Sequence, residues 1–156
     1  MRQARGQGLP IYGETLHNYA CFNAENYRET NGMKYHTYPS LKSEEDRQAL
    51  MDGLTDGGLS TVATDLVATT WEDKIKFKTV ADTTGGHNGI ETRMGVAYTE
   101  VVAKRGGSLE RFVDITSANA AKIFGLYPRK GALAAGSDAD IAILDPSINR
   151  ALSQDE

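Results

Sequence analysis

The chain contains too few strand-forming segments to build a closed sheet, and this limits its fold more than any other feature. Three short runs have strand-like composition, at residues 9–15, 61–65 and 139–145. The run 61–65 is rich in β-branched residues and follows glycines, which predicts a buried strand that ends at Asp65. The run 139–145 stands alone after a helical region, and a lone strand is unstable without partners. We therefore expect a mixed α/β fold whose sheet is completed by strands outside this chain.

Helical patterns occupy most of the intervals between these runs. A capping serine and an acidic first turn predict a helix over 43–57. Apolar residues along one face predict a second helix over 91–104, and further helices are expected over 109–115 and 117–124. Residues 69–88 show neither pattern, and an irregular stretch of about 20 residues inside a compact domain is usually functional.

Charge and composition exclude several classes of protein. The chain has 17 Lys and Arg against 21 Asp and Glu, a net charge of −4, which favours neither nucleic acid nor an anionic membrane as a partner. No window approaches the roughly 20 apolar residues of a membrane span, and the N-terminus lacks the apolar core of a secretory signal. Cys21 is the only cysteine, so neither an internal disulfide nor a thiolate metal cluster can form. We expect a cytoplasmic location.

Asp65 is the strongest candidate for chemistry. It lies at the C-terminal end of a predicted buried strand, where α/β enzymes place catalytic groups and hard-metal ligands. The competing interpretation is that its carboxylate caps the next turn. Asp138 and Asp140 lie beside Gly136 and Ser137, and we interpret them as turn residues.

The three histidines show no spacing typical of a metal site. His17, His36 and His87 lack pairing at two or four residues, so each alone is more typical of a structural or surface histidine. His87 is the best functional candidate of the three, because it lies in the glycine-rich loop after Asp65. No nucleotide-binding glycine motif and no nucleophile elbow occur. The residues alone thus suggest an enzyme but do not specify its reaction.

A family resemblance rests on runs that occur in order along the chain. The segment from Ser108 to Gly131, which ends in Tyr-Pro-Arg-Lys-Gly, resembles the cyclic amidohydrolases, namely the dihydropyrimidinases and D-hydantoinases. Gly136 to Ile141, which reads Gly-Ser-Asp-Ala-Asp-Ile, is similar to the same family. Weaker matching runs lie elsewhere, at residues 11–15, 34–35, 39–42, 89–100 and 145–146.

The resemblance implies the C-terminal portion of a metal-dependent hydrolase. Residues 1–130 would form the last strands and helices of a (β/α)8 TIM barrel, and residues 131–156 would enter a small C-terminal β-sandwich. Family members hold two divalent metals, usually zinc, bridged by a carboxylated lysine and a hydroxide. Asp65 matches the aspartate of the last barrel strand, which would bind one metal and take a proton from the attacking water.

The resemblance also implies substrate contacts from backbone groups on two loops. Tyr38 falls on the first loop, where hydantoinases commonly have serine, and Gly85 falls on the second, where they commonly have asparagine. Leu66 stands where a histidine usually follows the aspartate, which points to a divergent subgroup. The implied substrate is a small cyclic amide or imide, opened by hydrolysis, and the implied assembly is a homo-oligomer, typically a tetramer.

The other metal ligands of the family would precede Met1, so we expect the isolated chain to lack hydrolase activity. Two other classes of function remain open. The first is a non-catalytic relative, similar to the dihydropyrimidinase-related proteins that act in assembly or as scaffolds. The second is a stand-alone α/β binding module. A His-x-His pair, a lysine and two further histidines encoded upstream in the same reading frame would favour the enzyme.

Overall fold

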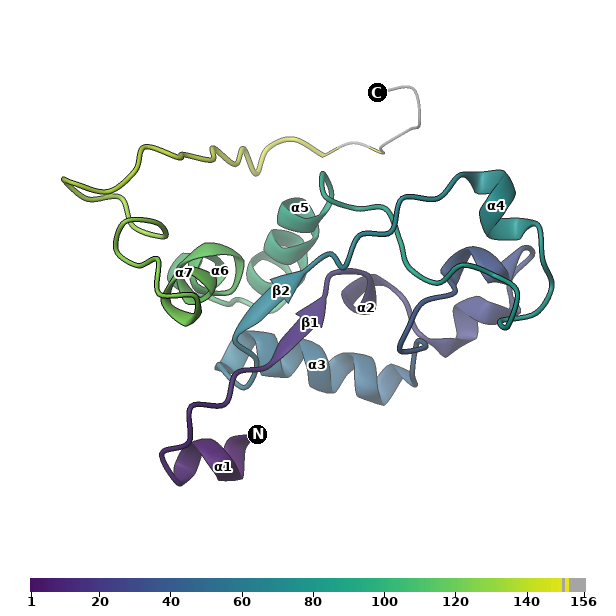
Figure 1. Ribbon diagram of the computed structural model, residues 1–156, viewed down its shortest axis with the longest axis horizontal. Coiled ribbons are helices and arrows are strands. Elements are labelled where there is room, and N and C mark those ends of the chain that lie inside the picture. Colours follow the sequence, from purple (N-terminus) through teal and green to yellow (C-terminus); the bar gives the residue numbers. More distant parts are fainter. Residues whose placement is uncertain (150, 152–156) are drawn as a thin grey trace.

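The computed structural model describes residues 1–149 and Ala151, and its centre is a short parallel sheet. Strand β1 (Glu14–Leu16) pairs with β2 (Thr61–Ala63), with Glu14 opposite Thr61 and Leu16 opposite Ala63. The two arrows lie side by side in Figure 1, and helical segments connect one to the other. The predicted α/β class is confirmed.

The strands are shorter than the sequence patterns predict. The run 9–15 enters the sheet only at Glu14, and β2 ends at Ala63 rather than at Asp65. Asp65 instead has a φ of 47°, in the left-handed region, so the chain has already turned out of the strand there. The strand predicted over 139–145 is wrong. The structure shows no strand there, because no other described strand lies alongside to accept its hydrogen bonds.

Capping residues mark both ends of the longest helix. The longest is α3 (Glu44–Asp56): the Ser43 hydroxyl accepts from the Asp46 amide, and the helix ends at Gly57 with a φ of 89°. The other elements before β2 are short: α1 (Arg2–Gly6), α2 (Asn18–Cys21) and the 3-10 helices η1 (Ala24–Arg28) and η2 (Gly32–Tyr35). Over the part of the chain described, none of the helices has the length and apolar character that crossing a membrane requires.

Two continuous helical segments follow the long loop, which itself contains the short α4 (Trp71–Ile75). The first joins α5 (Arg93–Ala97) to the π-helical η3 (Tyr98–Ala103), in agreement with the predicted helix. The second runs through α6 (Leu109–Val113), the π-helical η4 (Asp114–Ala118) and α7 (Asn119–Ile123) without a break.

The prediction of two separate helices in the second segment is therefore wrong. A side chain explains the change of geometry at the expected break: the Thr116 hydroxyl donates to the Phe112 carbonyl at 2.7 Å. Such a bond competes with the regular backbone ladder. The Asn119 amide then donates to the carbonyl of Asp114, five residues back, and the helix continues.

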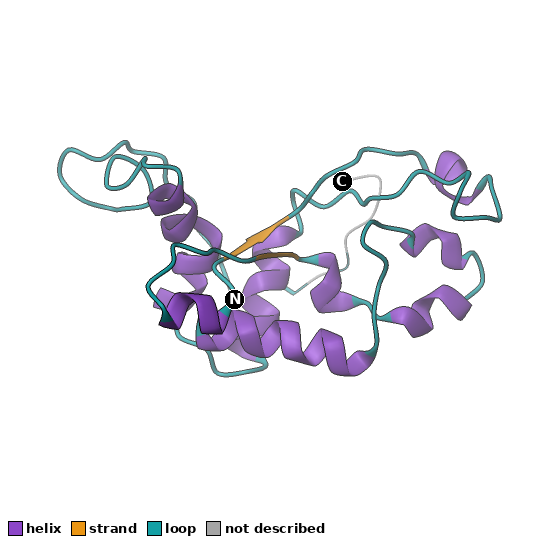
Figure 2. Cartoon of the chain, turned by 60° about the horizontal axis from the view of Figure 1, so that its bottom comes forward, coloured by secondary structure: helices purple, strands orange, loops and turns teal. Residues whose placement is uncertain are grey.

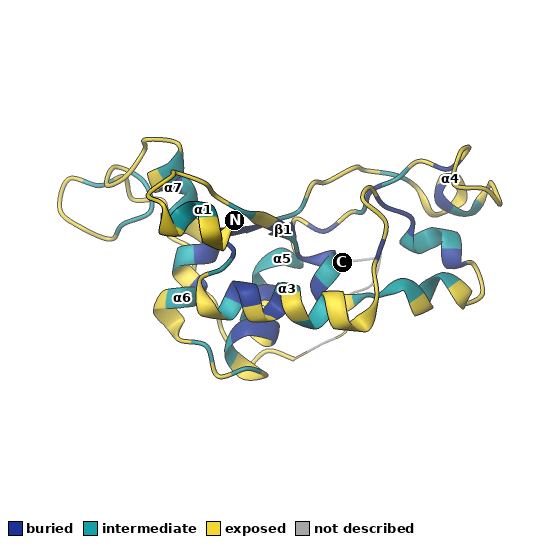
Figure 3. Ribbon diagram, turned by 90° about the horizontal axis from the view of Figure 1, so that it is seen from below, coloured by how far each residue is buried: buried dark blue, intermediate teal, exposed yellow. Residues whose placement is uncertain are grey.

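Most of the helices lie on one side of the two strands, whereas α4 lies apart from them (Figure 1 and Figure 2). Buried residues from α3, β2, η3, α6 and η4 form one apolar cluster that includes Met51, Leu54, Val62, Val101 and Ile115. Figure 3 shows the buried side of α3 facing the neighbouring helices, with exposed residues on its outer side. Most of the buried residues of this cluster lie on helices, and Val62 is its member on a strand.

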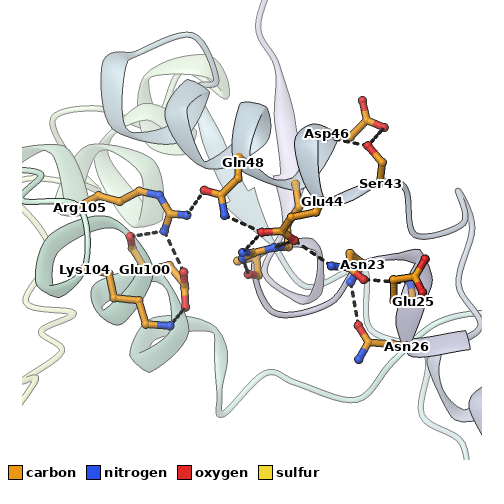
Figure 4. A network of polar contacts seen from close by, with 12 residues as sticks. Asn23, Glu25, Asn26, Ser43, Glu44, Asp46, Gln48, Glu100, Lys104 and Arg105 are labelled. Atoms are coloured by element: carbon orange, nitrogen blue, oxygen red, sulfur yellow. Dashed lines mark hydrogen bonds and ion pairs between the residues drawn. The ribbon is translucent and has the colours of Figure 1, made fainter. Parts of the chain in front are cut away.

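A polar network joins α3 to η3 at the edge of this core (Figure 4). Arg105 donates to Glu100 and to Gln48, at 2.9 and 2.8 Å, and Gln48 donates to Glu44 at 2.7 Å. Glu44 also accepts from Asn23 at 2.8 Å. The network therefore fixes the relative position of the two helices that support the sheet.

Removal of a core side chain should destabilise the whole assembly of helices and strands. Leu54 is 1% exposed, and Leu54→Ala should lower the free energy of unfolding by about 2–5 kcal/mol. Leu133 is 81% exposed, so Leu133→Ala should change it by less than about 0.5 kcal/mol. Urea denaturation followed by circular dichroism measures both values, and equal losses would contradict this description of the core.

Candidate functional site

The carboxyl ends of the two parallel strands meet at one edge of the sheet. His17 follows β1, and its backbone amide donates to the Ala63 carbonyl at 3.1 Å. Its ring Nδ1 lies 3.4 Å from the same oxygen. Asp65 follows β2 by two residues. Ligand sites of α/β proteins lie at this edge, so the arrangement defines a candidate active site.

The Asp65 side chain is open to solvent at this edge. The residue is exposed, and among the hydrogen bonds of the described residues none involves its carboxylate. A role in capping the following turn therefore has no support in the structure. A carboxylate in this position can accept a proton from water or bind a cation.

The segment after Asp65 pairs with the glycine-rich loop. Leu66 forms an isolated parallel bridge with His87, and the Val67 amide donates to the His87 carbonyl at 3.2 Å. Gly86 lies so close to Val67 that a β-carbon at Gly86 would be 2.7 Å from that side chain. This loop is thus held beside Asp65.

Tyr38 and Gly85, both predicted to contact substrate, lie against each other. A β-carbon added at Gly85 would be 2.5 Å from the Tyr38 ring, closer than real contacts allow. The Tyr38 hydroxyl donates to the Val80 carbonyl at 3.2 Å, and its ring packs edge-on against the His36 ring at 4.7 Å. Glycine at position 85 therefore leaves the room that the tyrosine at position 38 occupies.

His87 is a neutral histidine held in place by an amide. Its Nδ1 lies 3.2 Å from the amide nitrogen of the Asn18 side chain, which can donate to it. Burial, followed by the charges of Lys74, His17 and His36, lowers the pKa of His87 to about 4. The ring is therefore uncharged at neutral pH.

Sequence spacing did not reveal that the other two histidines, His17 and His36, help to lower the pKa of His87. His17 and His36 lie far apart in sequence from His87 yet close enough in space to lower its pKa. Burial also lowers the pKa of both His17 and His36. His36 is 3% exposed, and within the described residues neither of its ring nitrogens has a hydrogen-bond partner. The sequence also carried no signal for Lys74, whose ammonium group is buried in this region.

The described residues do not fit a two-metal centre by themselves. Among residues 1–149 and 151, no group of three or more histidine, cysteine, aspartate or glutamate side chains could hold a metal ion. Asp65 is exposed and supplies a single carboxylate, whereas catalytic zinc takes three protein ligands. These residues alone therefore do not support a catalytic step at a metal ion.

The sequence from residue 13 to residue 156 matches the amidohydrolase family, and the chain belongs to this family of metal-dependent hydrolases. D-phenylhydantoinase of Escherichia coli O1:K1 / APEC is 35% identical over 148 residues, which are 94% of this chain and 32% of the relative. The chain thus spans about a third of the length of the curated relatives that it matches.

Solved structures agree with the sequence match. The D-hydantoinase from Bacillus sp. AR9 superposes with a TM-score of 0.89 at 36% identity, over 98% of this chain and 34% of that one. The L-hydantoinase (dihydropyrimidinase) from Arthrobacter aurescens gives a TM-score of 0.78 at 31% identity, over 88% of this chain and 30% of that one. The resemblance to the dihydropyrimidinase and hydantoinase group is therefore confirmed.

The contact between Tyr38 and Gly85 predicts an energetic coupling between them. Gly85→Ala should destabilise the chain by about 1–3 kcal/mol, because the added methyl group displaces the Tyr38 ring. In a Tyr38→Ser background the same change should cost less, since the ring is gone. A double-mutant cycle in urea measures the difference, and equal costs in both backgrounds would show that the two residues do not interact.

The depressed pKa of His87 predicts a loss of stability in acid. The unfolded chain binds a proton at the histidine near pH 6.5, whereas the folded chain binds it only near pH 4. The free energy of unfolding should therefore fall as the pH drops from about 6.5 to 4. His87→Asn keeps an acceptor for Asn18 but cannot titrate, so it should flatten this slope.

His17 and His36, whose pKa values are also lowered, should contribute to the slope that remains in His87→Asn, and carboxyl groups with lowered pKa values, such as Glu100, add to it near the acid end of the range. Denaturation curves across this pH range supply the measurement. An unchanged slope in His87→Asn would mean that His87 titrates normally in the folded chain.

Proposed function

We propose that this chain supplies the acidic residue and two substrate-contact loops of an enzyme that hydrolyses cyclic amides, such as a dihydropyrimidine or hydantoin ring. The main support is the bridge between Leu66 and His87, which puts the segment after Asp65 beside the loop of Gly85. Gly85 in turn touches Tyr38. These contacts connect the segment after Asp65, through the glycine-rich loop, to Tyr38, which supports a shared role for the three residues.

Each proposed residue has a role that its surroundings allow. Asp65 accepts the proton of the attacking water on its exposed carboxylate and returns it to the ring nitrogen when the carbon–nitrogen bond breaks. Backbone groups at Tyr38 and Gly85 bind the ring amide. His87, neutral and held by Asn18, is a further candidate for contact with substrate.

The complete site would hold two zinc ions, and Asp65 would bind one of them. The remaining ligands would come from outside the described residues, since these supply no cluster of three. We also propose that residues 1–130 belong to a (β/α)8 barrel and that residues 131–156 enter a β-sandwich, in a cytoplasmic tetramer. Exposed apolar side chains in the second segment, Leu133, Ile141 and Ile143, support a further packing partner there.

Ring opening of hydantoin and dihydrouracil tests the proposed reaction. The assay compares this chain alone with the polypeptide encoded by the whole reading frame that contains it, each supplied with zinc. We expect activity only where the other metal ligands are present, and Asp65→Asn should lower it by about 10²–10⁴-fold. Asp52→Asn, on the exposed side of α3, is the matched control and should leave it unchanged.

The absence of ring opening in both polypeptides would contradict the proposal and favour a non-catalytic, dihydropyrimidinase-related scaffold.

Metal content gives an independent prediction. One exposed carboxylate does not hold zinc against the ion's own hydration, so the chain alone should retain less than one zinc ion after dialysis. Elemental analysis measures this ratio. One or more tightly bound ions per chain would show that the described residues form a metal site after all.

A further inference from the structure

Lys74 on α4 is a buried lysine without an acidic partner. Its side chain is buried, with the residue 6% exposed, although lysines are almost never fully buried unless they are paired. The salt bridges of the described residues do not include it. Burial lowers the pKa of its ammonium group, as expected for a charge removed from water. Something in the fold must offset this cost.

Three backbone carbonyl groups surround the ammonium nitrogen. Lys74 Nζ donates to the carbonyl oxygens of His36 and Gly86, at 2.6 Å each, and to that of Thr84 at 3.0 Å. An ammonium group has three donors, and all three are used here. Hydrogen bonds from a charged donor are about twice as strong as neutral ones, so the three carbonyls hold the charge firmly.

These carbonyl groups belong to the two loops proposed to bind substrate. His36 precedes Tyr38 by two residues, whereas Thr84 and Gly86 flank Gly85. The Gly86 amide also donates to the His36 carbonyl, at 3.1 Å. The ammonium group therefore stands at the point where the two loops meet, and it bonds to both of them.

An apolar side chain would fill the same space without the cost of a buried charge. The ammonium group instead fixes the distance between the two loops, because each of its three hydrogen bonds has a preferred length. Backbone contacts with substrate depend on that distance, since rotation of a side chain cannot compensate for a displaced backbone.

We propose that Lys74 is a positioning residue, whose ammonium group sets the distance between the Tyr38 and Gly85 loops and so the geometry of substrate binding. The effect of Lys74 on substrate binding rests on the proposed function. The effect of Lys74 on the two loops rests on its hydrogen bonds alone.

The test compares Lys74→Met with Lys78→Met, the same change at an exposed lysine of the same loop. Backbone amide exchange in the 156-residue chain is the first measurement. In Lys74→Met the Gly86 amide should exchange about tenfold faster or more, because the loops separate. In Lys78→Met it should stay within about twofold of the unmodified chain. Unchanged exchange in Lys74→Met overturns the proposal.

Chemical rescue distinguishes an effect of the missing ammonium group from a general destabilisation of the two loops. Lys74→Ala removes three methylene groups and the ammonium, which propylammonium can replace. Propylammonium should restore slow exchange at Gly86, whereas tetramethylammonium, which has the charge but no N–H donor, should not. Equal effects of the two ions overturn the proposal.

Kinetics in the polypeptide that opens cyclic amides test the effect on substrate. Lys74→Met should raise KM by about tenfold or more with a much smaller change in kcat, since binding contacts are displaced. A fall in kcat at unchanged KM indicates a merely structural lysine and overturns the positioning role. If no polypeptide shows ring opening, the proposed function fails, while amide exchange and rescue still decide whether Lys74 holds the loops.

Discussion

The position of β2 depends on side-chain donors from the helices. Two strands of three residues each cannot form a stable sheet alone. One edge of β2 pairs with β1, whereas the Val62 carbonyl and the carbonyls of the two residues just before the strand accept from side chains. Arg93 donates to Val62 at 3.2 Å, Asn119 donates to Ser60 at 2.9 Å, and Arg111 donates to Leu59 at 2.5 Å. The helices thus hold the strand that leads into Asp65.

The candidate site is built the same way, from backbone groups held by a few polar side chains. Lys74 joins the two loops, Asn18 holds His87, and the bridge at Leu66 attaches the glycine-rich loop to the segment after β2. The loops carry little apolar core of their own, since the apolar cluster lies among the helices. Local polar contacts therefore determine the geometry of the site.

The sequence predicted the helices better than the strands or the site. Caps and one-sided apolar patterns are local signals, and the helix that begins after Ser43 follows them closely. Strand pairing depends on partners distant in sequence, so 139–145 looked like a strand yet pairs with no described strand. The role of Lys74 left no local signal either, because its three partners are carbonyls of other loops. Asp65 was identified from its place at the end of a predicted strand, whereas Tyr38 and Gly85 came from family resemblance, and the functions of all three stay predictions.

We propose that Asp65 belongs to the metal site of a cyclic-amide hydrolase. Anomalous diffraction at the zinc edge, from crystals of the zinc-loaded polypeptide that contains this chain and opens cyclic amides, tests it most directly. We expect a zinc ion about 2.0–2.2 Å from an oxygen of the Asp65 carboxylate. Zinc ions whose protein ligands do not include Asp65 would contradict this role of Asp65.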